Sequence, residues 1–160
     1  MNGKRSLFEG GQRVSFIMQW PNMINSGQIT NNAINQIDLI ATLAEMTGAI
    51  LNDCDAYDSH SFYRAVCDLA GVTPAQVRGN QPMVTEVPEK ESGDGLGERI
   101  RCGSQKMLYA EDQWWMFDLV DDPSETTNIM DENLAEFASL KGTLYEVIDN
   151  SFSDTTAVYP

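Results

Sequence analysis

The segment that most constrains the fold is 99–119, where short apolar and aromatic runs alternate with turn residues. The runs are 99–102, 106–109 and 114–119, separated by turns at 103–104 and 111–113. Runs of this length between tight turns are typical of an antiparallel meander. Residues 83–87 add one more short strand, and apolar residues at helical spacing over 132–149 predict a helix that covers the sheet.

The first half of the chain has a different pattern. Residues 13–20 are mostly apolar and are stopped by Pro21, which predicts a strand covered on both faces, as inside an α/β sheet. Helices are predicted over 36–47 and 61–70, each followed by a glycine. The expected order is therefore a strand, two helices, an antiparallel sheet and a closing helix.

Charge and cysteine content narrow the classes of function. With 24 acidic and 10 basic side chains among 160 residues, the formal net charge is −14, which argues against a nucleic-acid partner. No apolar run reaches the roughly 18 residues of a membrane span, so no membrane partner is expected. Three cysteines without a Cys-x-x-Cys spacing predict neither a disulfide framework nor a zinc site, although one disulfide stays open.

Four segments carry family-like motifs in chain order. They are Gly3-Lys4-Arg5-Ser6-Leu7-Phe8-Glu9-Gly10-Gly11-Gln12-Arg13-Val14; Gln36-Ile37-Asp38-Leu39 with Thr42-Leu43 and Gly48; Asp58-Ser59-His60-Ser61-Phe62; and 99–106 with Phe117-Asp118-Leu119 and 122–129. Together they resemble the type I sulfatases of the alkaline phosphatase superfamily, and they cover nearly the whole chain. The first and last segments are the most specific, because they are similar to Gly-Lys-x-Ser/Thr-x-Tyr/Phe-Glu-Gly-Gly-x-Arg and to Asp-Pro-x-Glu-x-x-Asn-Leu, with Ile129 at the last position.

The resemblance implies a fold and a division of the chain. Residues 1–71 would be the C-terminal part of a sulfatase-like α/β core, with one strand and two helices. Residues 72–160 would be a C-terminal subdomain in which a small antiparallel sheet packs against a C-terminal helix. The parent enzyme would hydrolyse a sulfate ester with the help of calcium and a formylglycine. Its partners would be a sulfated small molecule or glycan and an N-terminal domain that precedes this segment.

The hallmark chemistry of that family is missing from this chain. None of Cys54, Cys67 and Cys102 lies in a Cys-x-Pro/Ala-x-Arg motif, from which the family makes its nucleophile. The paired aspartates and the Asp-Asn metal ligands would lie upstream. The family histidine of the second segment is replaced by Gln36 and its proline by Ala41. The isolated chain is therefore expected to hold no cofactor or metal and to be inactive.

Lys4 is the one catalytic residue that the resemblance assigns. It matches the family lysine that contacts the sulfate and the leaving-group oxygen, where an ammonium would stabilise developing negative charge. Glu9, Gly10, Gly11 and Arg13 are interpreted as structural support. The two glycines are expected to allow a backbone path closed to residues with a Cβ, and Glu9 with Arg13 to tie the turn to the next strand.

Other conspicuous side chains favour structural roles. Trp114, Trp115 and Phe117 alternate on one strand and are expected to serve the core rather than a sugar-binding platform. His60, the single histidine, is expected to cap a helix or lie at the surface. The acidic run 53–58 lacks the spacing of a calcium loop and is expected to be a solvated turn.

Two other functions stay open at this point. One is a phosphonate or phosphodiester hydrolase of the same superfamily, which would share this C-terminal layout. The other is a non-catalytic module derived from a sulfatase. A bare fragment would expose the apolar stretch 16–20 and self-associate. Family habit favours the periplasm, the cell exterior or the lysosome, and no signal peptide is recognised after Met1.

Overall fold

A computed structural model describes residues 6–52, 54–67, 77–87, 97–110 and 112–153. The chain forms two compact units. The first comprises the described parts of residues 1–15 and 80–160, and the second those of residues 16–79. None of the helices in these ranges has the length and apolar character needed to cross a membrane. The predicted division after residue 71 falls outside the described residues and stays a prediction.

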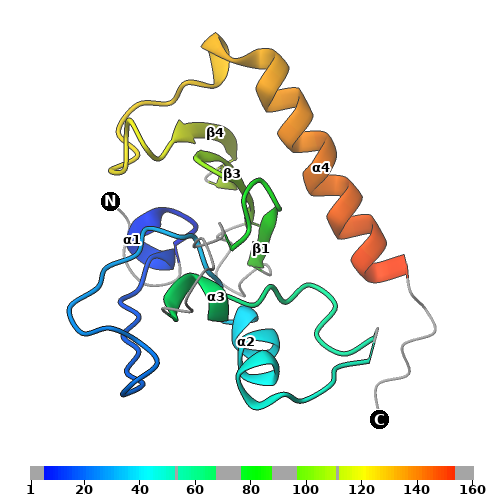
Figure 1. The fold of residues 1–160 in the computed structure, drawn as a ribbon. Coiled ribbons are helices and arrows are strands. Elements are labelled where there is room, and N and C mark those ends of the chain that lie inside the picture. Colours follow the sequence, from blue (N-terminus) through cyan, green and yellow to red (C-terminus); the bar gives the residue numbers. More distant parts are fainter. Residues whose placement is uncertain (1–5, 53, 68–76, 88–96, 111, 154–160) are drawn as a thin grey trace. The chain divides into compact units, whose positions relative to one another are not determined.

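The first unit is built on a four-stranded antiparallel sheet (Figure 1). Each strand pairs with its neighbour in sequence, in the order β1-β2-β3-β4. The predicted meander and the closing helix are therefore confirmed, with the helix lying beside β2 and β3. The elements are β1 Met83–Val87, β2 Gly97–Cys102, β3 Gln105–Ala110, β4 Gln113–Asp118, the 3-10 helix η1 Met130–Glu132 and the helix α4 Leu134–Ser153.

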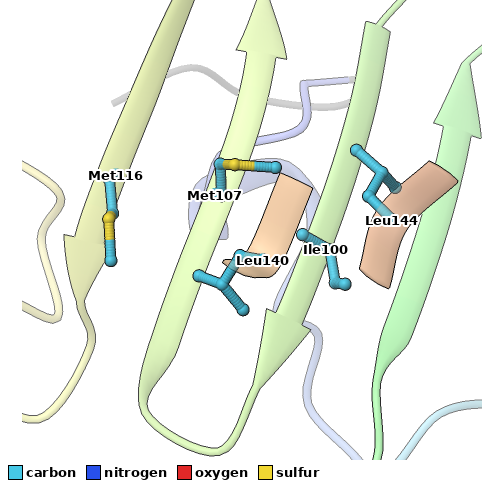
Figure 2. Close-up of a cluster of buried hydrophobic side chains, with 5 residues drawn as sticks. All are labelled: Ile100, Met107, Met116, Leu140 and Leu144. Atoms are coloured by element: carbon cyan, nitrogen blue, oxygen red, sulfur yellow. The ribbon is translucent and has the colours of Figure 1, made fainter. Parts of the chain in front are cut away.

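One face of the sheet forms an apolar core with α4. Ile100, Met107 and Met116 are direct cross-strand partners on β2, β3 and β4, and all three are fully buried. Leu140 and Leu144 of α4 pack on them, as Figure 2 shows. Since strand residues alternate between faces, the intervening residues of the same strands point to the opposite face.

That opposite face is covered by the N-terminal segment. Leu108 and Phe117 are fully buried there and form a second cluster with Leu7. Phe8 packs edge-on against Trp115, whose ring stacks on Phe117. The short helix α1 Glu9–Gln12, which the sequence did not predict, follows directly. The aromatic residues of β4 thus serve the core, as expected.

The second unit contains two helices within its described residues. The helix α2 runs Asp38–Thr47 and ends at Gly48, whose φ of 71° is the left-handed conformation predicted for a C-terminal glycine. It begins two residues later than expected, with Ile37 as its N-cap. The helix α3 spans Tyr63–Val66, so the described part of the second predicted helix is short, and residues 68–70 lie outside the described ranges.

The strand predicted over residues 13–20 is wrong. These residues form no helix or strand, and Val14, Phe16 and Ile17 are exposed by 69%, 49% and 91%. An apolar run becomes a strand only when a neighbouring strand satisfies its backbone groups. The described residues of the second unit include no strand to pair with it. Phe16 instead packs edge-on against the buried Phe62.

Candidate functional site

Lys4, the predicted sulfate-contacting residue, lies outside the described residues. The described chain begins at Ser6, two positions further on, and is fixed to the sheet from there. The described segment that follows Lys4 in the sequence is Ser6 to Gln12, which ends with the helix α1.

Apolar contacts dock this segment on the sheet. Leu7 is 4% exposed and packs on Leu108 and Phe117. A Cβ on Gly97, at the start of β2, would stand 2.7 Å from Cδ1 of Leu7. Contacts this short do not occur between real side chains, so the missing side chain of Gly97 leaves the space that Leu7 fills.

A buried ion cluster joins the segment to the sheet at residue 9. Nζ of Lys106 lies 3.0 Å from Oε1 of Glu9 and 2.5 Å from Oε1 of Glu125. The Lys106 side chain is fully buried, and those of Glu9 and Glu125 are 12% and 2% exposed. A buried ammonium has to be paired, and here it bridges α1, β3 and the turn after β4.

Glu125 also binds residue 9 directly. Its Oε2 accepts a hydrogen bond of 2.6 Å from the backbone N–H of Glu9, in the first turn of α1. Glu125 has a φ of 55°, which is uncommon for a residue with a Cβ. Asp122 shapes this turn by accepting hydrogen bonds from the backbone N–H groups of Thr126 and Thr127. The turn thereby aims the Glu125 carboxylate at both Lys106 and α1.

Nearby cations stabilise the ionised form of Glu9. Burial by itself raises the pKa of Glu9, but the Lys106 ammonium, with Arg101 and Arg99, outweighs it and holds that pKa below its usual value. Burial lowers the pKa of Arg99, whose Nη1 lies 3.8 Å from Oε1 of Glu9. Nε of Arg99 is buried and has no hydrogen-bond partner among the residues that the structure describes. The Glu9 and Glu125 carboxylates thus face Lys106 and Arg99 in a largely dehydrated space, with Arg101 acting on Glu9 as well.

The residues interpreted as structural support, Glu9, Gly10, Gly11 and Arg13, differ in the contacts that they make. The Glu9 carboxylate pairs with Lys106 and approaches Arg99, whereas Arg13 is exposed and is joined to Glu9 by a backbone hydrogen bond of 2.8 Å. Gly10 and Gly11 lie within α1, and neither is among the described residues with a positive φ. The backbone conformation that only glycine readily adopts is therefore not found at Gly10 and Gly11, because residues with a Cβ also adopt right-handed helical angles.

The second unit has a buried ion pair of its own. The Asp38 carboxylate accepts hydrogen bonds from Nε of Arg78 at 2.9 Å and from the backbone N–H groups of Asn35 and His60 at 2.7 and 2.9 Å. Nη2 of Arg78 also donates to Asp38 and to the carbonyl of Asp58. Burial opposes ionisation of Asp38, but these donors hold its pKa below the usual value.

Hydroxyl groups extend this network between α2 and residues 58–62. Thr42 donates to the backbone carbonyl of Asp38 at 2.6 Å and accepts from the N–H of Phe62 at 3.0 Å. Ser59 accepts from the N–H of Ala41 and donates to the carbonyl of Ile37. The motif residues Asp38, Thr42 and Ser59 therefore act together as a structural tie. His60 donates its backbone N–H to the Asp38 carboxylate, and its expected role as a helix cap or surface residue stays a prediction.

Within the described ranges, the side chains form no metal or nucleophile site like that of the family which the chain resembles. Among the described residues, no group of three or more His, Cys, Asp or Glu side chains is placed to hold a metal ion. Cys54, Cys67 and Cys102 are free thiols outside the nucleophile motif, and the described Asp55 carboxylate binds Asn52 in a local turn. No chemical step through calcium or a formylglycine follows from these side chains.

Sequence reasoning missed the partners of both networks. Lys106 shares a strand face with Leu108, and a lysine on an apolar face was a usable signal that it is buried and paired. Glu125 and Arg78 gave no such signal, because each lies in irregular chain. Their roles depend on contacts 116 and 40 residues away in sequence.

Comparison with known proteins finds similar sequences among the arylsulfatases. No model of a protein family matches the chain. Arylsulfatase H of Canis lupus familiaris is 28% identical over 155 residues, which cover 83% of this chain and 27% of that protein. An arylsulfatase of Hemicentrotus pulcherrimus is 39% identical over 59 residues, covering 37% of this chain and 10% of that protein.

A solved structure of BT4656 in complex with its substrate D-glucosamine-2-N,6-O-disulfate has a TM-score of 0.48 at 22% identity, covering 71% of this chain and 23% of that one. The chain thus spans about a quarter, or less, of the proteins that it matches. By its sequence similarity to the arylsulfatases, the chain is related to the sulfatases and resembles a C-terminal portion of them.

Proposed function

We propose that this chain supplies the C-terminal portion of a sulfate ester hydrolase and that Lys4 contacts the sulfate and the leaving-group oxygen there. The observation that carries the proposal is the docking of Leu7 and Glu9 on the sheet, directly after Lys4 in the chain. The relatives named arylsulfatase favour a sulfate ester over the phosphonate and phosphodiester substrates of the wider superfamily.

The chemistry of the proposal assigns Lys4 an electrostatic role. Cleavage of the S–O bond leaves negative charge on the departing oxygen, and an ammonium placed beside it lowers the barrier. Calcium and a formylglycine would come from residues outside this chain. A sulfated small molecule or glycan would be the substrate, and the chain by itself would turn over none.

The first test uses the longest native product that contains this chain. Its coding sequence is expected to include a Cys-x-Pro/Ala-x-Arg motif upstream of Met1. With an aryl sulfate as substrate, Lys4→Ala should lower kcat by about 10²–10³-fold, the usual effect of removing one donor from a developing anion. The matched control is Lys141→Ala. Lys141 belongs to α4 and lies over the ring of Trp114 on β4, on the sheet face opposite the segment that follows Lys4.

The same preparation distinguishes the alternatives. Faster turnover of an aryl phosphodiester or phosphonate than of the aryl sulfate would assign the protein to another branch of the superfamily. Absence of turnover with all three would leave a non-catalytic module. Full activity of Lys4→Ala would remove Lys4 from the mechanism while leaving the sulfatase assignment in place.

A partner for the second unit is also part of the proposal. Ile17, Ile40 and Leu43 are among several large apolar side chains exposed there. We propose that an N-terminal sulfatase domain covers them and that the isolated 160-residue chain self-associates in its absence. Light scattering behind size-exclusion chromatography decides this, because a clean monomer at high concentration would contradict it.

A further inference from the structure

We propose that Lys106 is a positioning residue for Lys4: through Glu9 and Glu125 it locks the segment that follows Lys4 onto the sheet. This inference rests on the proposed function, because it names the device that would hold the sulfate-contacting ammonium in place. Lys106 itself contacts carboxylates of this chain, 3.0 Å and 2.5 Å away, and has no assigned contact with substrate.

Lys106 does not serve the apolar core. Its side chain is fully buried on the sheet face that carries Leu108 and Phe117. An apolar side chain at this position would avoid the cost of removing an ammonium from water. A buried charge instead constrains geometry, because each carboxylate must stay within hydrogen-bond reach to compensate it.

Glu125 and Lys106 together fix both the main chain and the side chain of Glu9, and these three residues form the lock. Glu125 accepts from the backbone N–H of Glu9, while Lys106 donates to the Glu9 carboxylate. Glu9 and Lys106 are 97 residues apart in sequence, and Glu9 and Glu125 are 116 apart. Two bonds of different direction on one residue prevent the segment from sliding or rotating on the sheet.

Hydrogen bonds within the segment carry this rigidity to its N-terminal end. Nε2 of Gln12 donates to the carbonyl of Ser6 at 2.9 Å, and the N–H of Phe8 donates to Oγ of Ser6 at 3.2 Å. These bonds make Ser6 to Gln12 one folded piece, with Glu9 at its centre. A displacement at Glu9 therefore reaches Ser6, the second residue after Lys4. A misplacement of about 1 Å is enough to cost a catalytic group about 10²-fold in rate.

The lock is tested by amide exchange on the 160-residue chain. In Lys106→Met, exchange of residues 7–12 should become about 100-fold faster, because two buried carboxylates lose their common partner. Exchange in β2 and β3 should change much less. Glu9→Gln is a milder variant that keeps Lys106 paired with Glu125, and about 10-fold is expected at the same residues.

The matched control is Leu144→Ala, which removes core packing on the other face of the sheet. It should accelerate exchange in α4 and the strands together, without selecting residues 7–12. Equal acceleration of residues 7–12 in Leu144→Ala and in both cluster variants would overturn the inference, since the cluster would then contribute only general stability. Restored protection in Lys106→Arg relative to Lys106→Met would support it, because Arg keeps the charge.

Kinetics of the native product test the link to Lys4. Lys4 is proposed to act on the leaving oxygen, so its misplacement should matter most for poor leaving groups. In Lys106→Met, kcat for phenyl sulfate should fall about tenfold more than kcat for 4-nitrophenyl sulfate. A loss of folded protein would lower both by the same factor, which makes this ratio specific for positioning. The double variant with Lys4→Ala should be no slower than Lys4→Ala alone.

The two proposals fail in distinguishable ways. A wild-type product without sulfatase activity, or a fully active Lys4→Ala, contradicts the proposed function, and the exchange result then still decides whether Lys106 locks the segment. An active enzyme that depends on Lys4 but shows equal losses for both substrates in Lys106→Met contradicts the positioning role alone.

Discussion

The two compact units each contain a buried ion network, and the surroundings of these networks differ. In the first unit, Lys106 lies between Glu9 and Glu125 on a sheet with apolar clusters on both faces. In the second unit, Asp38 and Arg78 tie α2 to residues 58–62. Both apolar clusters found in the described residues belong to the first unit.

The difference in apolar burial is large. Within the described part of residues 16–79, only Ala44, Phe62 and Cys67 are buried apolar side chains, whereas nine large apolar side chains are exposed. The described part of the first unit exposes four. A buried ion pair adds little net stability, because its attraction hardly exceeds the cost of desolvation, but losing one partner leaves an uncompensated buried charge. A unit with few buried apolar side chains has little else to offset such a loss. The second unit therefore depends on its polar network far more than the first unit does.

The largest effect is expected from Asp38→Asn in the second unit. The substitution leaves Arg78 buried without its charge partner, which typically costs about 3–5 kcal/mol of unfolding free energy. Amide exchange should accelerate in α2 and leave the strands β3 and β4 protected. Glu45→Gln is the control, since the exposed pair of Glu45 with Arg64 should matter little. Equal acceleration in α2 and the sheet would erase the proposed contrast.

A matched pair of leucines sharpens the comparison in the apolar direction. Leu144→Ala in the first unit removes a fully buried side chain and should cost about 2–5 kcal/mol of unfolding free energy. Leu43→Ala in α2 removes a side chain that is 53% exposed and should stay within about 0.5 kcal/mol. Denaturant melts of the two variants against the wild type measure both values. A large loss for Leu43→Ala would show that the chain covers this residue in solution.

The smallest effect expected is a loss of stability in acid. The pKa values of Glu9 and Asp38 in the folded state lie below the ordinary 4.5 and 3.8. As the pH falls, the unfolded state therefore binds protons at these groups before the folded state does. The contribution is complete above the ordinary pKa values and is lost as pH falls through the lowered folded ones. Unfolding free energies measured from about pH 7 to about pH 3 check this. Glu9→Gln should flatten the acid loss in the first unit only, and an unchanged slope would contradict its role.

The regular elements of the first unit were predictable, because local patterns decide them. Alternating runs with turn residues between them placed the strands over 97–118 to within two residues, and helical spacing placed α4. The same reasoning failed for residues 13–20, since an apolar run does not state whether a partner strand exists. The motif containing Glu9 was recognised, and Glu9 with Arg13 was expected to tie the turn to the next strand, whereas the Glu9 carboxylate pairs with Lys106.

The sequence by itself determined the family resemblance, the sheet, the closing helix and the left-handed Gly48, since each depends on residues close together in the chain. Only the tertiary structure decided which charges meet. Asp38 and Arg78 are 40 residues apart, and Glu9 and Glu125 are 116 apart, so no local spacing predicts their contact. Burial then makes those contacts obligatory, because a charge removed from water has to find its partner within the fold.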